Sequence, residues 1–581
     1  MSPQSLQILS TAASDQIWEG PVLTDPLTGA YLPNRFVFLK WEILSDFFQE
    51  LDRRPVTTPA ECDRWIRDLG DLESQMHDAY QHCHALKTFA PLDPVTARFD
   101  SNLNNYEAVW ENARQHLYEK LLTLTPLMTE EYADHRRLKA VIQNRSEHFS
   151  WDGYSCDNQI LRLVRELCEL DDAIDVVVGC SHSEESSDKE LWRARQELTT
   201  RHQPEIDRWI QSLLLARNQS ARVRGHEDFS EYALAGQESL DYSMEQLCQV
   251  AANVLEQFSP LAERCLESRA RQCGFRTVRP WQDLDEADIP YVSRLEQFVP
   301  LEQALRNTLA AVSPAFQELF DQHRHLFVLD PYDSEDKSGD SVVLHYARMG
   351  KYLLSARLDG GALSLTELFH EATHLLEAVS VHNQQAFYWY RQPPTEISEG
   401  LAIAMELISA EHYSGLYKPR FIDAARTRII EDQIISLVEH ARNILFERAL
   451  YLNPESDPGA KWVEFAGKAF PSMNWTGLEA FRDKEYLDFL HLLADPFTGI
   501  NYLMGGLISF QLHELYRKDP AATTGRMLAT MQAGDSRPLP EIYTILGVPF
   551  PFDPKVITAT ANYAQDLLSS AYLRSHETGA K

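Results

Sequence analysis

Long apolar runs, paired cysteines and basic charge are all scarce in this chain, and each shortage excludes a class of protein. No run of eighteen apolar residues occurs, whereas a helix that crosses a bilayer needs about 20, so we expect no membrane-spanning segment. The eight cysteines include no CxxC pair and are sparse for a scaffold held together by disulfides. We interpret them as small buried apolar residues in a reducing cytoplasm, which also suits the lack of a signal-peptide pattern in Met1 to Ser10.

Basic residues are outnumbered, with 54 lysines and arginines against 86 aspartates and glutamates and a net charge of -32. A surface of this sign repels phosphate backbones and anionic lipid, so we expect neither nucleic acid nor a membrane as a partner. The charge either serves solubility or creates a field that draws in cationic peptides, and both interpretations stay open. The oligomeric state does not follow from composition.

Strand signals are almost absent from the first half of the chain. From Leu39 to about Arg324, apolar residues recur at spacings of three and four, which is typical of amphipathic helices. The one convincing β region is Val342 to Leu358, and its last strand, Lys351 to Leu358, is expected to offer a free edge that an extended peptide can join. An acidic, serine-rich stretch at Ser181 to Lys189 predicts a boundary near residue 185. The predicted fold class is mainly α with a small β-sheet.

The predicted helix from Ser364 to Val379 contains the pattern His370-Glu371-x-x-His374. Positions four apart lie on the same face of a helix, so His370 and His374 can bind one metal ion through neutral imidazoles. Glu371 follows the first histidine and can deprotonate a water molecule that zinc polarises. The pattern therefore predicts a catalytic site with one zinc ion per chain.

A catalytic zinc needs a third protein ligand and an open fourth position. Two prolines precede a second predicted helix, which carries the acids Glu396, Glu399 and Glu406. We prefer Glu399 as the third ligand and keep Glu396 as the competing choice. Glu406 is seven residues after Glu399 and shares its face, so we expect it to hydrogen-bond a ligand histidine from behind.

These motifs resemble those of the thimet oligopeptidase and oligoendopeptidase F family of zinc peptidases, in which a glutamate follows the second histidine by twenty-five positions and another acid follows seven later. This spacing selects Glu399. Leu215 to Phe229 is similar to a segment that these peptidases carry before the zinc helix. Asn501 to Glu514, with His491 upstream, is similar to their transition-state-binding segment and to the one in angiotensin-converting enzyme. The resemblance spans roughly residues 200 to 540.

The resemblance implies a large helical zincin-type peptidase with a small β-sheet next to the active-site helix and a deep central channel. Residues 1–185 would then form part of the channel wall, and residues 186–581 would form the catalytic peptidase domain. Tyr502 and His491 match the family's donors to the oxyanion of the transition state. The chain departs from the family after the first histidine, with Thr373 in place of glycine and Glu377 in place of histidine or tyrosine, so we expect the substrate pocket to differ.

The predicted function is that of a zinc metallopeptidase that hydrolyses short, unstructured peptides in the cytoplasm, with Glu371 as general base. One alternative is a non-catalytic helical protein that binds peptides, although such a protein has no chemical reason to keep Glu371 beside the histidines. The other is a zinc hydrolase that acts on another amide or on a modified peptide. Cleavage preference, and endopeptidase against exopeptidase action, do not follow from these residues.

Overall fold

The computed structural model describes most of residues 41–579, and its longer gaps fall within 125–134, 149–158, 171–187, 238–240, 283–291, 333–340 and 359–363. The described chain is mainly α-helical with one three-stranded sheet, which confirms the predicted fold class. The predicted boundary stretch, Ser181 to Lys189, lies mostly outside the described residues. Among the described helices, none has the length and apolarity that a membrane crossing requires.

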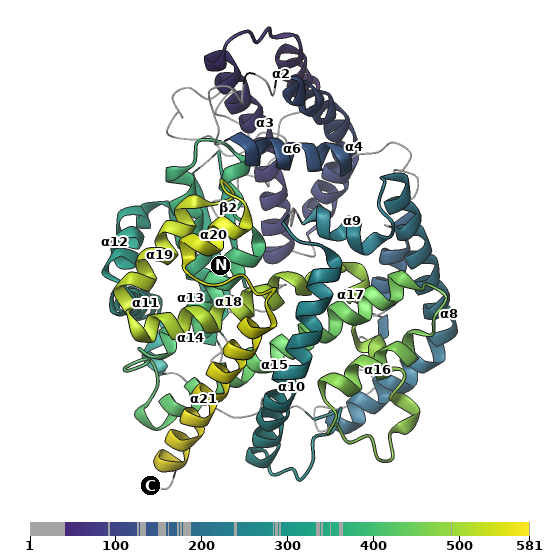
Figure 1. Ribbon diagram of the computed structural model, residues 1–581, viewed down its shortest axis with the longest axis vertical. Coiled ribbons are helices and arrows are strands. Elements are labelled where there is room, and N and C mark those ends of the chain that lie inside the picture. Colours follow the sequence, from purple (N-terminus) through teal and green to yellow (C-terminus); the bar gives the residue numbers. More distant parts are fainter. Residues whose placement is uncertain are drawn as a thin grey trace.

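The N-terminal helices form a core of their own at the top of Figure 1. Thr58 and Glu61 form a capping box that starts the second of these helices. The helices bury Trp65 and Trp110 between them, and Trp389, from much later in the chain, joins the same cluster. These helices are α2 (Trp41–Arg53), α3 (Pro59–Phe89), α4 (Pro94–Thr123) and α6 (Arg136–His148).

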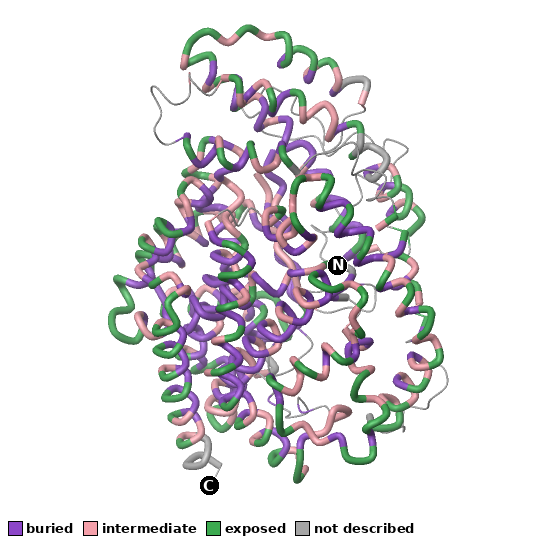
Figure 2. The backbone as a smooth tube through the Cα atoms, turned by 45° about the vertical axis from the view of Figure 1, so that its right-hand side comes forward, coloured by how far each residue is buried: buried purple, intermediate pink, exposed green. Residues whose placement is uncertain are grey.

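The remaining helices share one larger core. Figure 2 shows buried residues running through the centre of this helical body, with exposed residues on the outer helices. The helices before the sheet are α8 (Asp188–Val223), α9 (Phe229–Gly236), α10 (Met244–Gln272), α11 (Phe298–Val312) and α12 (Pro314–His323). Those after it are α13 (Ser364–Gln384), α14 (Thr395–Ala410), α15 (Pro419–Leu452), α16 (Pro458–Ala469), α17 (His491–Ala494), α18 (Gly499–Lys518), α19 (Pro520–Ala533), α20 (Leu539–Leu546) and α21 (Pro554–Gly579).

The sheet has the strand order β1-β3-β2. β1 (Phe327–Tyr332) is parallel to β3 (Lys351–Leu358), and β2 (Val342–Tyr346) is antiparallel to it. The expectation that Lys351 to Leu358 offers a free edge is therefore wrong, because β3 is the central strand and pairs on both sides. β1 was missed because it ends in Asp-Pro-Tyr, a pattern typical of a loop, although an edge strand tolerates proline.

Helices α14 and α18 pack closely because glycines face each other across their interface. A Cβ atom at Gly505 would lie 2.9 Å from the Gly400 nitrogen and 3.1 Å from the Glu399 Cβ. A Cβ atom at Gly400 would lie 2.9 Å from the Ile508 side chain. This close approach brings the helix that carries Glu399 against the helix that carries Tyr502.

Candidate active site

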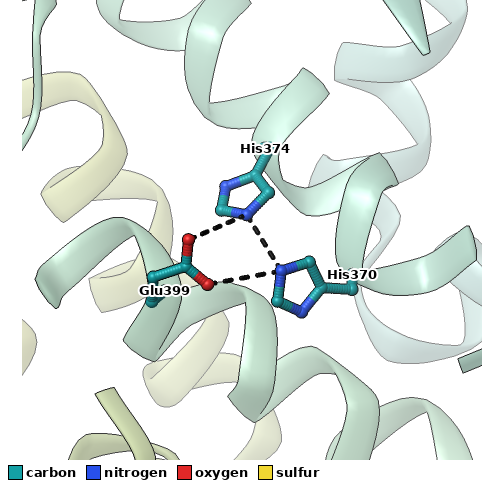
Figure 3. Close-up of side chains that lie close together, drawn as sticks. All are labelled: His370, His374 and Glu399. Carbon is teal, nitrogen blue, oxygen red and sulfur yellow. Dashed lines mark hydrogen bonds and ion pairs between the residues drawn. The ribbon is translucent and has the colours of Figure 1, made fainter. Parts of the chain in front are cut away.

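Three side chains with metal-ligand chemistry converge from two helices. α13 carries His370 and His374, α14 carries Glu399, and their ligand atoms all lie within 4.8 Å of one another (Figure 3). The two histidine Nε2 atoms are 3.0 Å apart, and Glu399 oxygens lie 3.4 Å from His370 Nε2 and 3.8 Å from His374 Nε2. Ligands about 2.1 Å from a tetrahedral zinc are separated by about 3.4 Å. The spacing of the three groups therefore suits zinc.

Glu406 lies behind His370. Its Oε1 is 2.6 Å from His370 Nδ1, and its Oε2 accepts a hydrogen bond of 2.8 Å from Gln433 Nε2 on α15. A carboxylate at Nδ1 keeps the proton on that nitrogen and leaves the Nε2 lone pair directed at Glu399 and His374.

Ser398 and Glu377 do the same for His374. The Ser398 hydroxyl lies 3.0 Å from His374 Nδ1 and donates a short hydrogen bond to Glu377, which is buried. Because that hydroxyl donates its own hydrogen to Glu377, its oxygen accepts a hydrogen bond from the Nδ1–H of His374. His374 Nε2 is therefore also left with its lone pair.

The chemistry of this donor set fits a cation. The two imidazole Nε2 atoms face each other across 3.0 Å, and the buried Oε2 of Glu399 lies 3.4 Å from His370 Nε2. Burial lowers the pKa of His370, but hydrogen bonds to Glu399 and Glu406 outweigh it and hold this pKa well above its usual 6.5. The site thus favours positive charge between the three groups, and a divalent metal supplies it with the ligands that zinc prefers.

Glu371 lies on α13, between the two histidines in sequence, and is only 7 % exposed. Burial raises the pKa of Glu371 above its usual 4.5, and the charges of His374 and His370 oppose that rise. A carboxylate with a raised pKa is a better base, as proton abstraction from water requires.

Glu396, the competing ligand, faces away from the histidines. It is buried and accepts hydrogen bonds from Tyr242 at 2.6 Å and Tyr543 at 3.1 Å. Burial raises the pKa of Glu396 to about 7 despite these two bonds. The structure therefore brings Glu399, and not Glu396, to the two histidines.

Tyr502 lies one helical turn before Gly505, which contacts Glu399, so its place on α18 is close to the metal-ligand group. Its side chain is 40 % exposed, and its ring stacks on the ring of His440 from α15, with centroids 5.1 Å apart and planes at 19°. His491 begins α17, but its side chain lies outside the described part, so its role stays a prediction.

A family model describes most of this architecture. Residues 181–559, well over half of the chain, match the model of peptidase family M3. The chain belongs to peptidase family M3. M3 peptidases are zinc metallopeptidases, so this chain is a metallopeptidase that acts on peptides, and the non-catalytic alternative is set aside. No curated protein matches the chain in a sequence search.

Several solved structures share the fold at low sequence identity. An oligoendopeptidase F is 18% identical with a TM-score of 0.78, and the match covers 91% of this chain and 97% of the other. PZ peptidase A, solved with an inhibitor, is 17% identical with a TM-score of 0.79 and the same coverage. An oligoendopeptidase F from Bacillus anthracis is 14% identical with a TM-score of 0.74, covering 91% and 96%. At these identities the likeness establishes the fold alone.

The Leu215 to Phe229 segment of this M3 peptidase forms buried hydrogen bonds to α15 and α17. Buried Arg217 donates to the carbonyl of Leu493 at 2.5 Å and to the Tyr451 hydroxyl at 3.0 Å. Asn218 donates to the Tyr451 carbonyl at 2.8 Å. The segment therefore fixes the end of α8 to α15 and to the chain just before Tyr502, a contact that residue types alone do not predict.

Sequence reasoning missed four residues around the M3 site: Glu377, Ser398, Gln433 and His440. Glu377 was noted only as a departure from the family, although its position three after His374 places it on a neighbouring face. Ser398 could have been found in the sequence, because it directly precedes the predicted ligand Glu399. No sequence signal connects Gln433 or His440 with the site, because each depends on how α15 packs.

Proposed function

We propose that this chain hydrolyses peptide bonds in short, unstructured peptides by means of one zinc ion held by His370, His374 and Glu399. The observation that carries the proposal is the convergence of two imidazole Nε2 atoms and the Glu399 carboxylate beside buried Glu371. When bound, zinc polarises a water molecule and the substrate carbonyl.

The protein's own residues then move the protons. Glu371 accepts a proton from the attacking water and passes it to the amine that leaves as the peptide bond breaks. The Tyr502 hydroxyl donates a hydrogen bond to the scissile carbonyl oxygen as negative charge builds on it. Glu406 and the Ser398 and Glu377 pair hold the histidines in the tautomer that zinc requires.

Substrate alignment is assigned to β2, because β3 has no free edge. The His345 end of β2 is already covered by α3, where its N–H donates to Gln81 at 3.1 Å. At the other end, Ser341 donates to Glu367 at 2.9 Å, one turn before Glu371 on α13. An extended peptide that pairs with this end of β2 would run past Glu371.

We further propose that residues 1–185 form part of the wall of a channel above the catalytic region, residues 186–581. The separate N-terminal core and its contacts with β2 support this division.

The described cysteines are free, which suits the reducing cytoplasm that the sequence predicts. Hydrolysis of another amide or of a modified peptide would use the same residues. Identifying which substrates the protein cleaves distinguishes this alternative from hydrolysis of ordinary peptides.

The test is Glu371→Gln, with zinc content and turnover measured on the same sample. The amide fills the same space but cannot accept the proton, so zinc should stay at about one per chain while kcat falls by roughly a hundredfold to ten-thousandfold. Glu464→Gln, on the exposed side of α16, should change neither quantity. Full turnover by Glu371→Gln would contradict the general-base role.

The same measurements test the ligands. His374→Ala and Glu399→Ala should each lose zinc, whereas Glu396→Gln should keep it, because Glu396 is occupied by two tyrosines. Full zinc in Glu399→Ala would refute the assigned ligand set.

A further inference from the structure

One face of α15 contacts several parts of the site at intervals of seven residues. Gln433 holds Glu406, and Glu447 accepts the backbone N–H of Phe497 at 2.6 Å. His440 lies midway between them, and residues seven apart share a helix face. α15 therefore aligns the ligand helix α14 and the tyrosine helix α18 from behind.

His440 fits into the first turn of α18. Its ring stacks on the Tyr502 ring, and a Cβ atom at Gly499 would lie only 3.2 Å from His440 Nδ1. The imidazole thus lies between the glycine backbone and the phenol ring. Burial, together with the charge of Arg442, lowers the pKa of His440 to about 4, so the stacked ring is neutral at neutral pH.

The start of α18 is fixed independently. Phe497 has a positive φ of 66°, a conformation that costs energy for a residue other than glycine. Its N–H donates to Glu447 and its carbonyl accepts from Gln237 at 3.0 Å, so surrounding contacts hold the turn. With the backbone of α18 fixed in this way, the position of the Tyr502 hydroxyl depends on the rotamer of its half-exposed side chain.

We propose that His440 is a positioning residue that restricts the Tyr502 side chain so that its hydroxyl meets the scissile carbonyl oxygen. This inference rests on the proposed function, in which Tyr502 is the hydrogen-bond donor. The stacked imidazole acts by contact, because a flat neutral ring restricts the side-chain torsion angles that the phenol can adopt before substrate binds. This restriction affects the rate, because misplacement of a catalytic group by about 1 Å can lower it roughly a hundredfold.

The experiment compares His440→Ala, His440→Phe, Tyr502→Phe and the double variant His440→Ala/Tyr502→Phe. His440→Ala should lower kcat by roughly tenfold to a hundredfold with little change in KM and unchanged zinc content. His440→Phe keeps a flat ring and should restore most of kcat. Tyr502→Phe should lower kcat by roughly a hundredfold or more, and the double variant should lose no more than Tyr502→Phe alone.

Binding gives a readout that does not depend on turnover. A phosphinic peptide, whose tetrahedral phosphorus imitates the transition state, should bind more weakly to His440→Ala, while a product peptide should bind as before. Three outcomes would overturn the inference if Tyr502→Phe still has a low kcat. They are a normal kcat in His440→Ala, a kcat in His440→Phe as low as in His440→Ala, and a decrease of kcat in the double variant equal to the product of the two single decreases. An unimpaired Tyr502→Phe would instead remove the Tyr502 role itself, and the inference with it.

Discussion

Ser398 and Glu377 show how single residues replace a feature of the family. Where related peptidases have histidine or tyrosine three positions after the second histidine, this chain has Glu377, which is buried and accepts from Ser398. Ser398 in turn accepts from His374. The departure noted in the sequence is thus part of the support for His374. Thr373, the other departure, is buried and bonds the Phe369 carbonyl of its own helix at 2.8 Å.

Ser398→Ala should weaken zinc binding by roughly tenfold to a hundredfold, because it leaves His374 Nδ1 unsupported and Glu377 buried without its partner. Competition with a chelator of known affinity measures the change. Ser409→Ala removes another buried hydroxyl of α14, which donates to the backbone carbonyl of Glu406 at 3.2 Å and bonds Tyr413 but contacts no imidazole nitrogen in these bonds, and it should leave zinc affinity unchanged. Equal zinc affinity in Ser398→Ala and the parent would refute the support role.

Glu447 predicts a pH dependence of stability. Burial raises the pKa of Glu447 to about 8, although the Phe497 N–H and Arg217 oppose the rise. Between its usual 4.5 and about 8, the folded state holds a proton that the unfolded chain has released, so this residue lowers the free energy of unfolding as pH rises through that window.

Because glutamine cannot ionise, Glu447→Gln should reduce the decrease of the unfolding free energy between pH 5 and 8. Denaturant unfolding at a series of pH values in this range measures the change. Exposed Glu514→Gln should leave the slope as it is in the parent. An unchanged slope in Glu447→Gln would mean that Glu447 ionises normally in the folded protein.

At the scale of elements, the interface of α14 and α18 sets the position of Glu399. Gly505 permits a close approach of α18 to α14. Any side chain at this position would block it, because the added Cβ would meet the backbone of Gly400 and the Cβ of Glu399. Gly506 faces Leu437 of α15 in the same way, with 2.7 Å from a Cβ to Leu437 Cδ2. Three helices therefore meet at two adjacent glycines, directly behind Glu399, the proposed third ligand.

Gly505→Ala should destabilise the fold by about 1 to 3 kcal/mol through overpacking and should also weaken zinc binding, because α14 must move away. Gly525→Ala is the matched control: Gly525 lies in helix α19 with no atom within 4 Å of the added Cβ, so alanine should stabilise the protein by up to about 1 kcal/mol. Thermal unfolding and chelator competition report the two effects separately. Normal zinc affinity in a destabilised Gly505→Ala would disconnect this packing from the metal site.

At the scale of the whole molecule, the N-terminal helices hold the sheet from outside. Asp78 of α3 accepts the N–H groups of Ala347 at 2.7 Å and Arg348 at 3.1 Å, just past the end of β2. These contacts close one end of β2. Under the proposed function, a substrate would pair with the end near Glu367 and lie extended between the N-terminal region and α13.

The enzyme should therefore cleave short flexible peptides and spare folded proteins, because a folded chain cannot offer an extended segment without local unfolding. A digestion series that runs from peptides of about five residues, roughly 17 Å long when extended, through unfolded chains to a stable globular protein measures this. Cleavage of the globular protein at the rate of the short peptides would exclude a restricted channel.

The sequence by itself determined the features that depend on local spacing. The helical class follows from apolar periodicity, and the placement of His370 and His374 on one face follows from the helical repeat. The spacing between His374 and Glu399, read with the family resemblance, selected the acid that the structure brings to the histidines. All of these are patterns within about thirty residues of chain, where backbone geometry alone relates positions.

Only the tertiary structure decided which distant residues meet. Glu396 accepts hydrogen bonds from Tyr242 and Tyr543, Gln433 donates to Glu406, and His440 stacks on Tyr502, and each contact joins separate segments of the chain. The same holds for β3, which is the last strand in sequence order but lies at the centre of the sheet because β1 pairs with its second edge. The physical reason is that these contacts are set by how closely whole helices and strands pack, which depends on glycines and buried surfaces across the molecule and not on any local repeat.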